Sequence, residues 1–187
     1  MSGNLFIVAT PIGNMGDITQ RARQILESCD LILAEDSRVT GTLLGMLGIN
    51  KKVLSYHKFT EKKFLEGHIE ALKNGMNIAL VSDAGTPAVS DPGKFIVRAA
   101  LDNKIPVIPV PGACAAAVAF SCSGSISDSF VFAGFIPSKG ADREKTLEKF
   151  LSYGLPVVFY EAPTRIKDLI AKLQDTGCRI VVMRELT

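Results

Sequence analysis

The stretch LFIVATPIGNMGD, residues 5–17, joins an apolar run to a loop that contains two glycines, a proline and an acid. The run LFIV predicts a β-strand, and a nucleotide-binding α/β protein would have its phosphate loop directly after it. Gly13 and Gly16, however, do not have the GxGxxG spacing, and Pro11 lacks the amide hydrogen that a pyrophosphate site would use. Alone, the loop predicts a tight connection to a helix with Asp17 as its N-cap.

Apolar runs and helical segments alternate along the first 112 residues. Strands are expected at LFIV (5–8), DLILAED (30–36), KVLSYH (52–57), NIALVSD (77–83) and IPVIPVP (105–111). Continuous Val, Ile and Leu runs separated by helices are typical of parallel strands that are covered on both faces. The pattern therefore predicts a mostly parallel, doubly wound α/β sheet in an N-terminal domain, residues 1–112.

A second α/β domain is expected over residues 113–187, because Pro109, Pro111 and Gly112 interrupt the alternation. Three more strands are expected at SFVFAGF (129–135), LPVVFYE (155–161) and CRIVVMREL (178–186). Helices are expected between these strands.

Length and composition support a globular protein with a sizeable core: 187 residues, 47% of them apolar, with a mean hydropathy of +0.25. No stretch of about eighteen apolar residues lacks charges, and the N-terminal run has no basic flank or cleavage pattern. We therefore expect no membrane span, no signal peptide and a cytoplasmic location.

Metal binding is not expected, because the four cysteines are scattered and only two histidines are present. The net charge of +2, from 21 basic and 19 acidic side chains, lacks the excess of a dedicated nucleic-acid-binding module. Any RNA contact would have to be local. Two basic groups could provide it: Lys51, Lys52, Lys58, Lys62 and Lys63, and Lys139, Arg143, Lys145 and Lys149. Solvated helix faces explain both groups equally well.

The carboxyl ends of the expected strands carry most of the polar motifs, and ligands of open α/β sheets bind beyond these ends. SDAGTPAVSDPG, residues 82–93, has two aspartates, two glycines and two prolines after a buried strand, which is more rigid backbone than a plain connection needs. Such a loop can offer backbone groups to a small polar ligand, while Asp83 can accept hydrogen bonds. It suits a ligand with a ribose, a base and an amino-acid tail.

ATPIGNMGDIT, AEDSR, SYH, SDAGTPAVSDPG, VPGA, FYEAPTR and RELT, in this order and spacing, resemble the S-adenosylmethionine-dependent methyltransferases of the tetrapyrrole methylase fold. Within that fold they are similar to the branch that 2′-O-methylates a cytidine of bacterial 16S rRNA in the small ribosomal subunit. The resemblance covers essentially the whole chain. It implies two α/β domains, the second with a mixed sheet, and a homodimer with the methyl donor in a cleft between the domains. Relatives continue past RELT, so the second domain is expected to be incomplete.

By position, the resemblance implies a set of donor-binding residues: Pro11, Ile12, Asp83, Ala84, Gly85, Thr86, Ala113, Cys114 and Tyr160. Many relatives have PGPSA at the domain junction, where this chain has PGACA. A hydroxyl contact would therefore be missing at Cys114, whereas a backbone contact would remain.

Three residues are expected to act on the substrate: Asp36, Arg38 and Glu161. A carboxylate near the ribose hydroxyl could take its proton, and an arginine could hold a phosphate. The alternative for Asp36 and Arg38 is a helix cap with a local ion pair. His57 is a further candidate, although a half-buried histidine at a strand end is favoured for it.

Two other functions stay open. A tetrapyrrole methyltransferase of the same fold would need a deep cleft with room for a macrocycle and would not require ribosomal subunits. A binding-only module would retain the donor pocket without catalysis.

Overall fold

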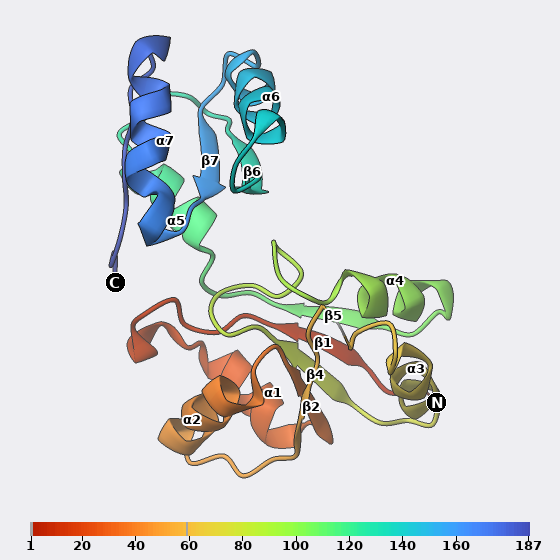
Figure 1. Cartoon of the computed structure of the whole chain (residues 1–187). Helices are drawn as coiled ribbons and strands as arrows, with labels where there is room; N and C mark the ends of the chain where they lie inside the picture. The colour runs from red at the N-terminus through yellow and green to blue at the C-terminus, as the bar shows by residue number, and fades with distance from the viewer. Residues whose placement is uncertain (1, 59) are drawn as a thin grey trace. The chain divides into compact units, whose positions relative to one another are not determined.

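The computed structural model describes residues 2–58 and 60–187, which divide into two units (Figure 1). The first unit contains the residues up to Cys114, and the second is Ala115–Leu186. This division falls two residues after the boundary expected at residue 112.

The first unit is built on one parallel sheet, as the sequence predicted. Its strands are β1 (Leu5–Val8), β2 (Leu31–Ala34), β3 (Val53–Ser55), β4 (Ile78–Val81) and β5 (Val107–Val110). They pair in the order β3-β2-β4-β1-β5, and every pair is parallel. The central strands β2 and β4 are buried at every position, which explains their continuous apolar sequences.

Helices cover both faces of this sheet (Figure 1). They are α1 (Gln20–Ser28), α2 (Ser37–Leu47), α3 (Leu65–Lys73) and α4 (Lys94–Asp102), with the short 3-10 helix η1 (Met15–Asp17) before α1. Ile32 of β2 packs in a core cluster with Leu26 of α1 and Leu44 of α2. Its neighbour Leu33 packs in a second cluster with residues of α3 and α4. Because successive side chains of a strand point to opposite faces, this alternation defines a doubly wound sheet.

Local signals set the helix ends. Asp36 caps α2 and Gly48 ends it in the left-handed conformation, with φ of 72°. The expected cap at Asp17 is wrong, because Asp17 is the last residue of η1. Thr19 caps α1 instead, through its hydroxyl, which accepts a hydrogen bond from the amide of Ala22 at 3.0 Å.

The second unit has a small parallel sheet of two strands, β6 (Val131–Phe135) and β7 (Val157–Tyr160), which is consistent with an α/β domain. Its other elements are α5 (Ala115–Cys122), α6 (Ala141–Leu151), η2 (Pro163–Arg165), α7 (Ile166–Leu173) and η3 (Gln174–Thr176). Ile136, Leu147, Leu169 and Leu173 form its buried cluster. The two strands described here are parallel to each other, so they do not by themselves form the mixed sheet that was expected.

The strand expected at residues 178–186 is wrong, because the structure assigns this segment neither strand nor helix. A strand needs a partner for its backbone groups, and this segment does not pair with β6 or β7. Its apolar residues Ile180, Val181 and Val182 are exposed instead. None of the helices in the described residues is both long and apolar enough to cross a membrane.

Candidate functional site: the crevice between β1 and β4

The loops after β1 and β4 leave neighbouring strands toward opposite faces of the sheet. β1 leads to α1 on one face, whereas β4 leads to α4 on the other. In open α/β sheets, such a reversal opens a crevice at the carboxyl ends of the strands, where ligands bind. ATPIGN and SDAGTP, the two motifs on which the sequence prediction rested, occupy these two loops.

Backbone hydrogen bonds join the two loops. The amide of Thr10 donates to the carbonyl of Gly85 at 2.9 Å, and the amide of Gly85 donates back to the carbonyl of Thr10 at 3.1 Å. The buried hydroxyl of Thr10 also donates to the carbonyl of Ser82 at 3.1 Å. These hydrogen bonds hold the two loops, residues 9–14 and 82–87, together as one rigid surface, which is named here the wall. Sequence reasoning missed the role of Thr10, and its position next to Pro11 in ATPIGN is the signal that could have revealed it.

Gly85 brings three loops together. Its φ is +85°, and a Cβ added there would lie 3.4 Å from Ile12 Cγ2 and 3.7 Å from the carbonyl oxygen of Ala113. The hydroxyl of Thr86 donates to that same carbonyl at 3.0 Å. Four of the residues predicted to bind the donor therefore lie close together in the first unit: Ile12, Gly85, Thr86 and Ala113. Pro11 directly precedes Ile12 in the chain.

Asp83 ties the β4 loop to the end of β2. Its Oδ1 accepts a hydrogen bond from the amide of Asp36 at 3.0 Å, while Asp83 and Ala84 both remain exposed. Burial raises the pKa of Glu35, and the nearby Asp91 and Asp83 carboxylates raise it further. The loops at residues 9–17, 82–93 and 111–114 contain no lysine or arginine. These three loops by themselves therefore favour a neutral or cationic ligand over a phosphate.

Asp36 and Arg38 form an exposed ion pair at the N-terminus of α2. Arg38 Nη2 lies 2.6 Å from Asp36 Oδ2, and Arg38 Nε lies 3.1 Å from Asp36 Oδ1. Hydrogen bonds from the Arg38 side chain and backbone lower the pKa of Asp36 to about 2. The alternative interpretation, a helix cap with a local ion pair, is confirmed. Asp36 and Arg38 nevertheless remain candidates for contact with the substrate, because the Arg38 side chain is 89% exposed.

Glu161 lies in a buried cluster of charges. Its Oε2 accepts a hydrogen bond from Arg143 Nη2 at 2.6 Å, and its Oε1 accepts from Arg165 Nε at 2.7 Å and from the amide of Ala162 at 2.8 Å. Burial raises the pKa of Glu161, but these hydrogen bonds outweigh it and hold the pKa below its usual range. Sequence reasoning grouped Arg143 with exposed lysines and missed its ion pair, because the two partners are far apart in the chain.

The remaining candidates are Tyr160, Cys114 and His57. Tyr160 belongs to the second unit, where its ring packs against Phe132 at 5.1 Å and Phe135 at 5.3 Å between centroids. Cys114 ends the first unit as a half-buried free thiol. His57 is half-buried directly after β3, and its amide donates to the hydroxyl of Thr60 at 3.1 Å.

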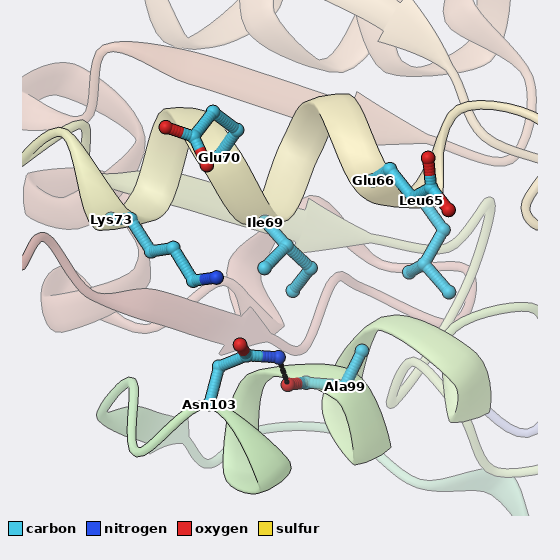
Figure 2. A pocket seen from close by; sticks show the side chains of 7 residues that line it. All are labelled: Leu65, Glu66, Ile69, Glu70, Lys73, Ala99 and Asn103. Atoms are coloured by element: carbon cyan, nitrogen blue, oxygen red, sulfur yellow. Dashed lines mark hydrogen bonds between the residues drawn. The ribbon is translucent and has the colours of Figure 1, made fainter.

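A pocket of about 290 Å³ lies elsewhere, between α3 and α4. Figure 2 shows Leu65 and Ile69 of α3 facing Ala99 of α4, with Lys73 and Asn103 at one end. It contains none of the predicted site residues. Within the described residues, no cluster of His, Cys, Asp and Glu side chains has the arrangement of a metal site.

The fold agrees with comparisons to known proteins. The family model of the tetrapyrrole (corrin/porphyrin) methylases matches residues 4–187, and the chain belongs to this family. It is similar to proteins named ribosomal RNA small subunit methyltransferase I: 45% identical over 190 residues to that of Pasteurella multocida, and 44% identical over 189 residues to that of Escherichia coli O157:H7. These matches cover 100% and 99% of this chain but 68% and 66% of the relatives, so the chain spans about two-thirds of their length.

A solved structure supports the fold. The native form of uroporphyrin III C-methyl transferase from Thermus thermophilus matches with a TM-score of 0.64 at 18% identity. The match covers 94% of this chain and 77% of that protein. At this level of identity the likeness concerns the fold.

Proposed function

We propose that the chain is an S-adenosylmethionine-dependent methyltransferase that 2′-O-methylates a cytidine ribose in the 16S rRNA of the small ribosomal subunit. The observation that carries the proposal is the wall made by Thr10 and Gly85, which joins the two motifs of the resemblance at the crevice. The names of the relatives at about 45% identity support the rRNA substrate. We further propose a cytoplasmic homodimer.

The residues at the crevice fit this methyl donor. S-adenosylmethionine carries no phosphate, and the loops of the wall offer acidic side chains and backbone groups without a lysine or arginine. Ile12 and Gly85 would border the donor, and the Asp83 carboxylate would accept hydrogen bonds from it. Cys114 and Tyr160 complete the proposed donor set. When bound, the donor supplies an electrophilic methyl group on its sulfonium.

Asp36 and Arg38 would act on the RNA. The exposed guanidinium of Arg38 suits a phosphate, which it can bind through two parallel hydrogen bonds. A carboxylate with a pKa of about 2 is a weak base, so we assign Asp36 to orienting Arg38 rather than to taking the proton of the ribose. Placing the acceptor oxygen in line with the donor methyl group can itself supply much of the acceleration.

Glu161 would support the second unit rather than carry the reaction. Both of its oxygens accept hydrogen bonds from arginines and its side chain is only 4% exposed, so a substrate hydroxyl has no open access to it. We therefore assign it to holding Arg143 and Arg165 near the end of β7, which is where Tyr160 lies.

The test is to incubate the protein with S-adenosylmethionine labelled on the methyl group and with small subunits that lack the modification. Label at the 2′-oxygen of a cytidine in 16S rRNA is the expected result. Label only in an added tetrapyrrole would overturn the proposal in favour of a small-molecule enzyme. If calorimetry detects donor binding but no methyl group is transferred to any acceptor, the protein is a binding module without catalysis.

A further inference from the structure

Two exposed phenylalanines and two lysines form a mixed aromatic and basic surface at the start of α3 and α4. Phe64 and Phe95 are 47% and 42% exposed. Lys62 Nζ lies 4.7 Å from the centroid of the Phe95 ring, and Lys63 Nζ lies 5.2 Å from that of the Phe64 ring. These four residues, named here the Lys–Phe surface, come from two segments more than thirty positions apart in the chain.

A buried contact fixes this surface next to the β4 loop. Glu61 is 7% exposed, and its Oε2 accepts a hydrogen bond from the amide of Gly93 at 3.2 Å. Gly93 precedes α4 and has a φ of +132°, and a Cβ there would lie 2.6 Å from Leu80 Cδ2. The carboxylate of Glu61 thus satisfies a donor at the N-terminus of α4. The turn that carries the lysines is held to the last residue of SDAGTPAVSDPG.

The surface differs from Lys51 in position and from Arg143 in exposure. Lys62 and Lys63 follow β3, on the same edge of the sheet as the crevice. Lys51 precedes β3, at the opposite edge, and its Nζ donates to the carbonyl of Cys29 at 3.0 Å. In the second basic group, Arg143 is buried in its ion pair with Glu161.

Exposed aromatic rings beside lysines are the chemistry that binds single-stranded nucleic acid. Bases stack on aromatic rings, and lysines neutralise the phosphates between them. Lysines are depleted at protein–protein interfaces relative to the rest of the surface, so the lysines beside these rings favour nucleic acid over a protein partner. Sequence-specific RNA recognition uses unpaired bases in this way, because the major groove of duplex RNA is too deep and narrow for side chains to read.

We propose that the Lys–Phe surface stacks unpaired bases that flank the target nucleotide in the RNA substrate. The proposal rests on the proposed function, because it assigns the RNA contact of that same site. The Glu61–Gly93 hydrogen bond then sets the distance between the stacked bases and the loop that borders the donor.

The test measures binding of a fluorescent single-stranded RNA of mixed sequence by anisotropy. Phe64→Ala and Phe95→Ala should each weaken binding by about fivefold or more, as expected for loss of one stacked base. Phe64→Leu and Phe95→Leu should weaken it similarly, because leucine retains apolar area but has no ring. Lys62→Gln should reduce the salt dependence of binding by about one counterion. Lys167→Gln, at an exposed lysine of α7 that belongs to neither basic group, is the matched control and should leave the affinity unchanged.

Wild-type affinity in both alanine variants, or leucine variants that bind as wild type does, would overturn the stacking surface. These results are separable from failure of the proposed function, which is measured as methyl transfer to small subunits. If wild-type protein transfers label to 16S rRNA and the phenylalanine variants do so with unchanged KM, only the surface is overturned. If wild-type protein transfers no label but the variants lose RNA affinity, the surface is supported and the proposed function is overturned.

Discussion

The two acid–arginine clusters have the same ion-pair distance and opposite environments. Arg38 lies 2.6 Å from Asp36 in the first unit, and Arg143 lies 2.6 Å from Glu161 in the second. The side chains of the first pair are 89% and 28% exposed, whereas both of the second pair are 4% exposed. Water screens the first pair and leaves its guanidinium open to a ligand, while the second pair must satisfy its own charges. Burial, rather than distance, separates a candidate substrate contact from a structural tie.

Removing one partner of the buried cluster should have the largest effect on stability. Arg143→Ala leaves the Glu161 charge buried with only part of its compensation, so we expect the second unit to lose about 3 kcal/mol. The chain has no tryptophan, and Tyr153 and Tyr160 lie in the second unit. Their fluorescence during urea unfolding, in a Tyr56→Phe background, reports on that unit.

The matched control for Arg143→Ala is Lys145→Ala, which removes an exposed charge from the same helix and should change stability by less than about 0.5 kcal/mol. Equal unfolding midpoints for the two variants would show that the buried cluster does not stabilise the second unit.

Acid should weaken the second unit through Glu161. Its pKa in the folded protein is below the ordinary value, so the folded state binds fewer protons than the unfolded state between the two values. The stabilisation is therefore complete above about pH 4.3, the ordinary pKa of glutamate, and is lost as the pH falls through the folded pKa. Urea midpoints measured by tyrosine fluorescence should fall over that range.

Glu161→Gln should be less stable at neutral pH, because it leaves two arginines without their counter-charge, and its midpoint should depend less on pH. A variant with the same acid dependence as wild type would assign the acid sensitivity to other carboxyl groups.

A smaller effect is expected in the helix that carries the exposed pair. Gly41 lies in the interior of α2, and a Cβ there would meet no atom within 4 Å. Gly41→Ala should stabilise the first unit by roughly 0.5–1 kcal/mol, because alanine loses less conformational freedom in a helix. Thermal unfolding followed by circular dichroism checks this prediction. A lower midpoint than that of wild type would show that the helix does not accommodate the added methyl group.

The parallel sheet and the two loops of the crevice could be predicted from the sequence, because buried strands and rigid turns are local patterns. The strand expected at residues 178–186 was wrong because strand formation depends on a partner that periodicity does not reveal. The sequence identified Asp36 as a helix cap or a substrate residue. It could not show how weak a base Asp36 is, because that depends on the hydrogen bonds that Arg38 donates to its carboxylate. The burial of Arg143 depends on Glu161, which is distant in sequence.

The exposed pair has the smallest expected effect on stability and a direct effect on the proposed reaction. Steady-state kinetics of methyl transfer to small subunits that lack the modification test this most directly, with Arg38→Ala compared with wild type. If Arg38 binds a phosphate of the RNA, KM for the subunits should rise by about tenfold or more, while kcat and donor affinity stay unchanged. An unchanged KM, with transfer otherwise intact, would contradict the assignment of the exposed pair to the substrate.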